Sequence, residues 1–277
     1  MKLVHLNAGN LDYWKQRSTP NVMALGFFDG VHKGHKKVIQ TAGSIANKKD
    51  LSLAVMSFFP HPKTILSKNS TTFDYIMPLS KKASVLESLG VDTFYVVECN
   101  KDFLSLLPEQ FVTHYLLGLD VVHAVAGFDF TYGHKAAGNI NRLQSDAMNQ
   151  IDVTKVEKID FHGKKISSTW IRELIATGDM GTLSSVLGRH YETEMYWDGE
   201  RFKLYPYYMM PAPGTYKATV KIKERHCDTK VYIPEDQQGV YIINSPKEKF
   251  FLNERVDISW LHREPTTTKY ANSVYMF

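Results

Sequence analysis

Short apolar segments alternate with amphipathic segments through the first part of the chain. Each apolar segment is bounded by glycine, proline or polar residues, which is typical of a buried strand, and the segments between show helical spacing of apolar residues. Strands separated by helices predict βαβ units, an α/β fold class and a doubly wound parallel sheet. The expected strands are residues 21–28, 51–58, 92–98, 121–126 and 154–159. The expected helices are residues 81–89, 108–117, 139–149 and 169–176, and one that begins near Lys33.

The pattern changes at Tyr191, after which aromatic and β-branched residues alternate with polar ones. Turn sequences such as Asp198-Gly199 and Pro213-Gly214 divide this region into strands, which predicts a small antiparallel β-barrel-like domain. We place the boundary between Leu187 and Tyr191, which gives domains of residues 1–187 and 188–277.

Composition narrows the class of protein. Of the 277 residues 43% are hydrophobic and 22% charged, and no apolar stretch is long enough to span a membrane. The N-terminus lacks a secretory pattern, and the two cysteines, Cys99 and Cys227, fit neither a disulfide framework nor a metal motif. The net charge of +4 is mild. We therefore expect a cytoplasmic protein that binds neither nucleic acid nor membrane, and scattered pairs such as Lys81-Lys82 and Lys164-Lys165 are interpreted as solvated surface.

The first expected strand runs directly into Phe28-Asp29-Gly30-Val31-His32-Lys33-Gly34-His35, where a helix begins. A helix N-terminus offers unpaired N–H groups and positive partial charge, which attract phosphate. Gly30 and Gly34 allow close approach of a ligand, and His32 and His35 can donate hydrogen bonds to phosphate oxygens. Two other interpretations are an ordinary turn with two exposed histidines and a zinc site, although zinc needs three or four ligands. Asp29 also suits a tight turn.

Two further loops follow expected strand ends: Pro60-His61-Pro62 and Gly127-Phe128-Asp129. Ligands of parallel sheets bind beyond the carboxyl ends of the strands, so these loops should share one rim with the histidine pair. Asp129 could equally bond its own backbone in a turn.

Residues 166–172 place three hydroxyls and Arg172 at the start of another helix. Ser168 or Thr169 would cap that helix, and the same hydroxyls with Arg172 could hold phosphates. The two roles are compatible.

The segment Phe28-Asp29-Gly30-x-His32-x-Gly34-His35 resembles the signature of the prokaryotic bifunctional riboflavin kinase/FMN adenylyltransferases, or FAD synthetases, of the nucleotidylyltransferase superfamily. Residues 58–62 are similar to the family's F-[DE]-P-H-P, with Phe59 where an acid is usual. Residues 127–133, followed by Gly138-Asn139, and residues 166–172 resemble two more family segments.

The resemblance implies a Rossmann-like nucleotidylyltransferase domain that makes FAD and pyrophosphate from FMN and ATP, with Mg²⁺ bound through the phosphates and no metal ligand from the protein. The implied residues are catalytic His32, His35 and Arg172; ATP-binding Phe28, Asp29, Gly30, Gly34, Ser167, Ser168 and Thr169; and flavin-binding Pro60, Pro62, Leu66 and Asp129. In that reading Gly133 and Gly138 bracket a flexible loop.

The tail departs from the family pattern. The kinase module carries a G-F-P-T-A-N segment whose Thr and Asn hold the metal-nucleotide, yet residues 201–213 contain neither Thr nor Asn. Residues 239–244 lack the glutamate expected as base. Without residues that hold the metal-nucleotide and without a catalytic base, the reactants of phosphoryl transfer would not be positioned. We therefore expect a degenerate module without riboflavin kinase activity. Exposed aromatics such as Tyr207-Tyr208 beside Met209-Met210 could support self-association, unless they fill the barrel's own core.

Two alternatives stay open at this point. The chain could be a non-catalytic flavin- or nucleotide-binding regulatory module, as the eroded tail suggests. It could also be an adenylyltransferase that acts on a different phosphomonoester, because the H-x-G-H segment is shared by transferases of different specificity.

Overall fold

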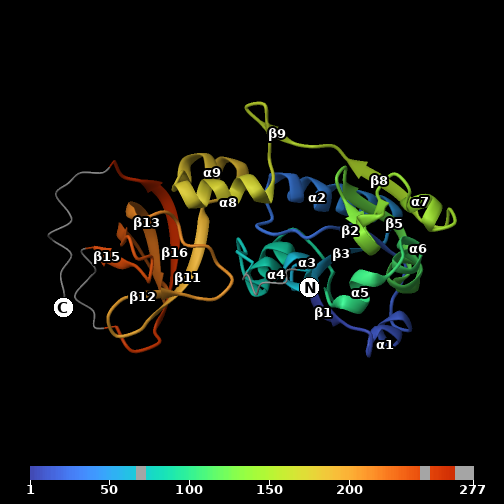
Figure 1. Cartoon of the computed structure of the whole chain (residues 1–277), viewed down its shortest axis with the longest axis horizontal. Helices are drawn as coiled ribbons and strands as arrows, with labels where there is room; N and C mark the ends of the chain where they lie inside the picture. The colour runs from blue at the N-terminus through green and yellow to red at the C-terminus, as the bar shows by residue number, and fades with distance from the viewer. Residues whose placement is uncertain (67–72, 244–249, 266–277) are drawn as a thin grey trace. The chain divides into compact units, whose positions relative to one another are not determined.

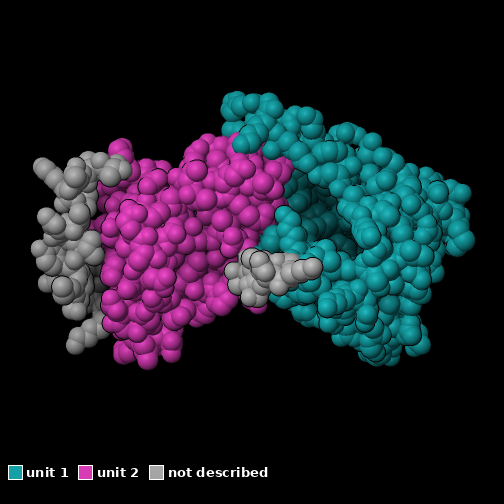
Figure 2. Space-filling model, viewed as in Figure 1, with its two compact units in different colours: residues 1–73, 79–165 teal, residues 74–78, 166–277 magenta. Residues whose placement is uncertain are grey.

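The computed structural model describes residues 1–66, 73–243 and 250–265, which form two compact units. The first unit comprises Met1–Phe73 and Leu79–Lys165, and the second comprises Asp74–Pro78 and Ile166–Phe277 (Figure 2). The second unit is therefore not one continuous stretch of sequence.

A six-stranded parallel sheet is the centre of the first unit (Figure 1). Its strand order is β1-β4-β3-β2-β5-β8, and every neighbouring pair is parallel. The strands are β1 Lys2–Leu6, β2 Asn21–Leu25, β3 Ser52–Phe59, β4 Thr93–Glu98, β5 Val121–Gly127 and β8 Asp152–Val156. The predicted parallel α/β sheet is confirmed.

Both faces of this sheet are covered. On one face, Met23 and Leu25 of β2 join a buried cluster with Phe111 and Tyr115. The alternate residues of β2 point the other way, towards α2 (Lys33–Lys49), which lies against β2, β3 and β5. The strand is buried at all five positions for this reason, as its uninterrupted apolar sequence predicted.

The helices of the first unit differ from expectation in two places. The helix expected over residues 108–117 is α6 (Pro108–Phe111), followed by a π-helical turn, η1 (Val112–Leu116), and a 3₁₀ turn, η2 (Leu117–Leu119). The helix expected over residues 139–149 is wrong: Gly138–Asn139 form strand β7, and only α7 (Leu143–Asp146) is helical. The Asn139 side chain accepts the Asn141 N–H, and such local bonds compete with the helix. The other short elements of this unit are α1 Leu11–Lys15, α3 Pro62–Leu66, α4 Leu79–Ser88, α5 Lys101–Ser105, β6 Thr131–Tyr132, η3 His134–Ala136, β9 Asp160–Phe161 and β10 Lys164–Lys165.

The second unit holds a six-stranded antiparallel sheet, in the order β12-β11-β16-β13-β14-β15, curled into a half-barrel. Alternate residues of each long strand are buried, and Trp260, Tyr216 and Phe202 are the largest of them. Helices α8 (Ser168–Thr177) and α9 (Met180–Leu187) belong to the same unit, and α9 packs on β16 and β11. The strands are β11 Tyr191–Trp197, β12 Phe202–Leu204, β13 Gly214–Ile222, β14 Arg225–Ile233, β15 Tyr241–Ile243 and β16 Arg255–Arg263. This confirms the predicted antiparallel β domain.

The change from helix to antiparallel strand falls between Leu187 and Tyr191, whereas the compact units divide earlier in the chain, at Ile166. The functional boundary at Leu187 stays a prediction. In the residues that the structure describes, no helix is long and apolar enough to cross a bilayer.

Candidate active site

The carboxyl ends of β2, β3 and β5 lie next to one another in the sheet, with β2 in the middle. From β2 the chain continues to β3 on one side and later returns to β5 on the other, so β2 and β5 flank a topological switch point. Such points are where open parallel sheets bind ligands. The loops after these three strands are the predicted motif loops, which places three of the four motifs at one edge of the first unit.

The turn that leads from β2 to α2 is strained. Phe28, Gly30 and Val31 have φ angles of 51°, 79° and 38°. Glycine adopts such angles readily, but a β-branched residue such as Val31 does not. Backbone strain of this kind costs about 1–3 kcal/mol per residue and persists where the surroundings enforce it. Phe28, Asp29 and Val31 are all buried, so packing holds the turn in place.

His32 is the N-cap of α2, and its Nδ1 accepts the backbone N–H of His35 at 3.2 Å. A nitrogen that accepts cannot carry the proton, so the neutral ring bears its hydrogen on Nε2. The two imidazoles are stacked, with centroids 3.5 Å apart and planes inclined by 17°. The alternative interpretation as an ordinary turn with two exposed histidines is wrong, because His32 is 5% exposed and His35 is half-buried. The hydrogen bond from the His35 N–H holds the His32 ring inside the turn.

His35 is held neutral. Burial is the largest cause that places the pKa of His35 well below its ordinary value, and the charge of Lys82 adds to it. Its Nδ1 is buried and has no hydrogen-bond partner among the described residues. The edge of the Phe28 ring packs against the imidazole, with centroids 5.3 Å apart. The site therefore contains a pair of imidazoles that act as hydrogen-bond donors rather than as permanent cations.

Lys82 is a residue of this site that the sequence analysis missed. It was assigned to solvated surface, but it is 4% exposed, and its Nζ donates to the Phe27 carbonyl at 2.8 Å and to Ser57 Oγ at 3.3 Å. Burial lowers the pKa of Lys82 to about 8, and the Asp29 carboxylate opposes that change. One signal was available: Lys82 stands four residues before Leu86, and both lie on the buried face of α4.

In the Pro60-His61-Pro62 loop, the main contacts are those of the His61 ring with neighbouring aromatic rings. The His61 imidazole stacks on Phe73 at 3.8 Å, and Phe27 meets His61 edge-on at 4.3 Å. Pro60 and Pro62 are half-buried, and Pro62 begins α3. Leu66, at the end of α3, is 69% exposed. The flavin wall of Pro60, Pro62 and Leu66 stays a prediction, and the structure adds Phe27, His61 and Phe73 beside it.

The loop after β5 presents Asp129. Its exposed carboxylate pairs with Lys165 Nζ at 2.5 Å, and the same ammonium lies 4.4 Å from the Phe128 ring centroid. Lys165 was also assigned to solvated surface, yet it is a partner of this predicted flavin-binding aspartate.

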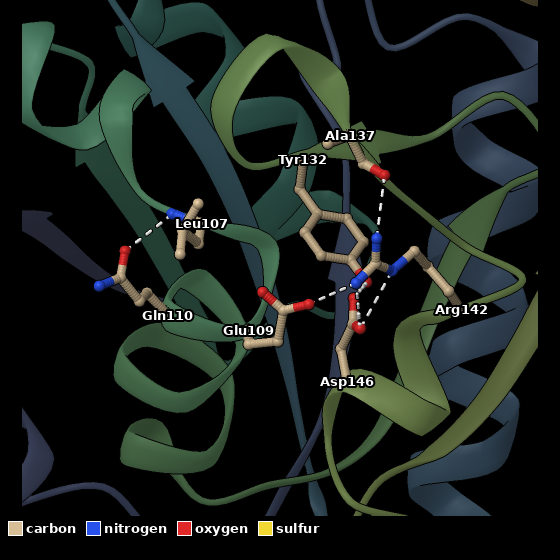
Figure 3. A network of polar contacts seen from close by, with 7 residues as sticks. All are labelled: Leu107, Glu109, Gln110, Tyr132, Ala137, Arg142 and Asp146. Carbon is tan, nitrogen blue, oxygen red and sulfur yellow. Dashed lines mark hydrogen bonds and ion pairs between the residues drawn. The ribbon is translucent and has the colours of Figure 1, made fainter.

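Beyond Asp129 the chain forms a hairpin of β6 and β7, where the resemblance implied a flexible loop. Gly138 is required there, since a Cβ would lie 2.4 Å from the Tyr132 ring. The Tyr132 hydroxyl donates to Asp146 Oδ2 at 2.6 Å, and Arg142 donates to Asp146 Oδ1 and to the Ala137 carbonyl (Figure 3). Arg142 also pairs with Glu109 of α6. This network ties both ends of the hairpin to the body of the unit.

The fourth motif belongs to the second unit. Ser167 is the N-cap of α8 and accepts the Trp170 N–H at 3.3 Å, so the expectation that Ser168 or Thr169 would cap is wrong. Capping by Ser167 places Ser168 and Thr169 in the first turn, half-buried and exposed respectively. Arg172 Nε donates to the Asp74 carbonyl at 2.7 Å, which orients the guanidinium from within its own unit.

The predicted surface patch of the tail is wrong in part. Tyr207 is exposed, but Tyr208 is buried, and Met209 and Met210 are half-buried. Tyr191 Oη donates to the Met209 carbonyl, which holds this segment against β11. Tyr208 thus packs into the fold of the second unit, whereas Tyr207 is exposed.

Comparison with known proteins places the chain in a family. The family model described as FAD synthetase matches residues 14–170, a span that contains the histidine turn and the hairpin. The chain belongs to the FAD synthetase family. This confirms the resemblance on which the residue roles were based.

Relatives within the family are similar over different shares of the chain. A bifunctional riboflavin kinase/FMN adenylyltransferase of Bacillus subtilis is 44% identical over 69% of this chain and 60% of its own length. One from Listeria monocytogenes is 35% identical over 94% of this chain and 88% of its own. A Listeria monocytogenes protein named FAD synthetase is 33% identical over 71% of this chain and 80% of its own.

Among solved structures, a macrolide-efflux protein from Streptococcus pneumoniae has a TM-score of 0.84 and is 25% identical, covering 99% of this chain and 94% of its own. Both units of the chain therefore have counterparts in one known structure.

Proposed function

We propose that this protein transfers the AMP moiety of ATP to FMN and releases pyrophosphate, so that it makes FAD. One observation carries the proposal: two stacked imidazoles open helix α2 at the carboxyl edge of the parallel sheet, within the span matched by the FAD synthetase family. A relative named FAD synthetase supports the choice of FMN as acceptor.

The geometry suits charge stabilisation without covalent catalysis. An oxygen of the FMN phosphate attacks the α-phosphorus of ATP as the bond to pyrophosphate breaks. The His32 Nε2–H and the N–H groups of the first turn of α2 donate to the oxygens on which charge develops. Because the turn is already strained and packed, these donors need little reorganisation when the reaction occurs.

The second motif supplies the other phosphate contacts in this proposal. Ser167, Ser168 and Thr169 stand at the N-terminus of α8, and Arg172 follows one turn later. An arginine bound at Nε to the Asp74 carbonyl keeps its charge and a fixed orientation, which suits the departing pyrophosphate. Asp129, Pro60, Pro62 and Leu66 are assigned to the flavin side.

Magnesium enters this scheme as part of the MgATP substrate. Within residues 1–66, 73–243 and 250–265, no group of three or more His, Cys, Asp or Glu side chains could hold a metal ion. Magnesium commonly binds through substrate phosphates and water, with few protein ligands.

We further propose that riboflavin kinase activity has been lost. The segment from Arg201 to Pro213 lacks Thr and Asn, and Tyr208 fills the interior there instead. Cytoplasmic location and self-association through the second unit also belong to the proposal, the former supported by the free thiols of Cys99 and Cys227.

The test is to incubate the purified protein with MgATP and either FMN or riboflavin, and to resolve the flavins by chromatography. We expect FAD from FMN and no FMN from riboflavin. FMN formed from riboflavin would contradict the loss of kinase activity. Absence of FAD from FMN would refute the transferase and favour a flavin-binding module, whereas adenylylation of another phosphomonoester in competition with FMN would change the acceptor.

A further inference from the structure

A buried lysine without an assigned task lies behind the histidine turn. Lys82 comes from α4 and lies on the buried face of that helix. Burying an ammonium is costly unless polar groups receive it. Here the receiving groups are the Phe27 carbonyl, Ser57 Oγ and, electrostatically, the Asp29 carboxylate.

The Phe27 carbonyl is the point that these contacts share. It accepts from Lys82 Nζ at 2.8 Å and from Ser57 Oγ at 2.8 Å. Phe27 immediately precedes the strained residues Phe28 to Val31. Its carbonyl direction sets the backbone angle at which the turn begins. A charged donor makes a stronger hydrogen bond than a neutral one, so Lys82 is the stronger of the two anchors.

We propose that Lys82 is a positioning residue for the transfer: its ammonium fixes the Phe27 carbonyl, and through it the turn that presents His32 and His35. The inference rests on the proposed function for its effect on turnover. Because Lys82 Nζ already donates to the Phe27 carbonyl and to Ser57 Oγ, its role is exerted through the turn and the two histidines.

The charge of Lys82 has a second consequence at His35. The groups that face this imidazole are His32 on the same turn, the Phe28 ring and Lys82 on α4. The ammonium repels the protonated form of His35, and together with burial it keeps the pKa of His35 low. Removal of the ammonium should therefore raise the pKa of His35, though only partly, because burial is the larger cause.

The experiment compares Lys82→Met with wild type and with Lys48→Met, which removes an equal charge from the exposed end of α2. We expect Lys82→Met to lower kcat by roughly 10- to 100-fold, with smaller changes in KM for ATP and FMN. The NMR titration of His35 should move to higher pH in Lys82→Met and stay unchanged in Lys48→Met. Lys82→Arg, which keeps the charge, should recover part of kcat and leave the His35 titration nearer to wild type.

Ser57→Ala covers the case in which Lys82→Met does not fold. It removes the other donor to the Phe27 carbonyl, and we expect a kcat lowered by a few-fold with the His35 titration little changed. If Lys82→Met folds, a wild-type kcat together with a wild-type His35 titration would overturn the inference. If Lys82→Met does not fold, an unchanged kcat in Ser57→Ala would overturn it. If the wild type makes no FAD, the proposed function fails by itself. The His35 titration in Lys82→Met then still tests, without any activity, whether Lys82 acts on the histidine turn, and an unchanged titration would overturn the inference.

Discussion

Replacement of Tyr132 by Phe would test whether the hairpin after β5 is held by one buried hydrogen bond. The substitution keeps the ring and removes only the hydroxyl, which donates to Asp146 Oδ2 at 2.6 Å. Arg142 donates to the other oxygen, Oδ1, at 3.0 and 2.7 Å, so Oδ2 would lose the donor that Figure 3 shows on it. The Asp146 side chain is 4% exposed, and water cannot readily replace that donor.

A hydrogen bond to a charged, buried partner contributes about 1.5–3 kcal/mol, so we expect the free energy of unfolding to fall by about 2 kcal/mol. For a chain of this size each kcal/mol shifts Tm by about 2–4 °C, which gives a decrease of roughly 4–8 °C. Differential scanning calorimetry measures it. The matched control is Tyr13→Phe, since Tyr13 is exposed and its ring contact with Arg17 survives. Equal melting temperatures for both variants would refute the argument that this bond anchors the hairpin.

Three further changes test other contacts. His32→Ala should lower the rate of FAD formation by roughly 10²-fold or more through the lost donor. It should also lower the free energy of unfolding by about 1 kcal/mol through the lost N-cap. An unchanged free energy of unfolding would contradict a stabilising role of the His32 cap. Gly138→Ala should lower Tm, because its Cβ would meet the Tyr132 ring at 2.4 Å. An unchanged Tm would show that the hairpin can shift to accommodate the Cβ without loss of stability. The folded-state pKa values of His35 and His123 lie below the unfolded value. The unfolded chain therefore binds more protons below about pH 6.5, and stability should decrease as pH falls from there. Thermal melts at pH 7.5 and 5.5 should show a smaller difference in His35→Gln, and an equal difference would contradict the assignment.

The inner strands β2, β3, β4 and β5 could be predicted from the sequence because they are mostly buried and form apolar runs. The edge strand β1 was not predicted, because only two of its five residues are buried and its sequence is no apolar run. The same reasoning failed at Asn139, where a side-chain bond to the backbone overrides a helical pattern. It also failed at Lys82, since a lysine beside another lysine is normally a surface residue. Its partners lie in other segments of the chain, Phe27 in the turn after β2 and Ser57 in β3, and no local pattern reveals that they meet it. His32 was predicted as a phosphate ligand, which stays a prediction, but its capping bond depends on ring orientation, which spacing alone does not give.

The division of the chain into units has a consequence for how the protein can be made. Asp74–Pro78 leave the ribosome long before the rest of the second unit, yet Tyr75, Ile76 and Met77 are buried, and Tyr75 meets Tyr207 edge-on at 5.4 Å. During synthesis from the N-terminus, these five residues cannot reach their folded positions until the C-terminal part of their unit has been made. A chain that stopped after Leu187 would keep Arg172, the partner of Asp74, but lose Tyr207. The sequence of the first unit is thus interrupted by five residues of the second unit. A gene fragment that encodes residues 1–165 alone would therefore also encode an apolar segment that belongs to the other unit.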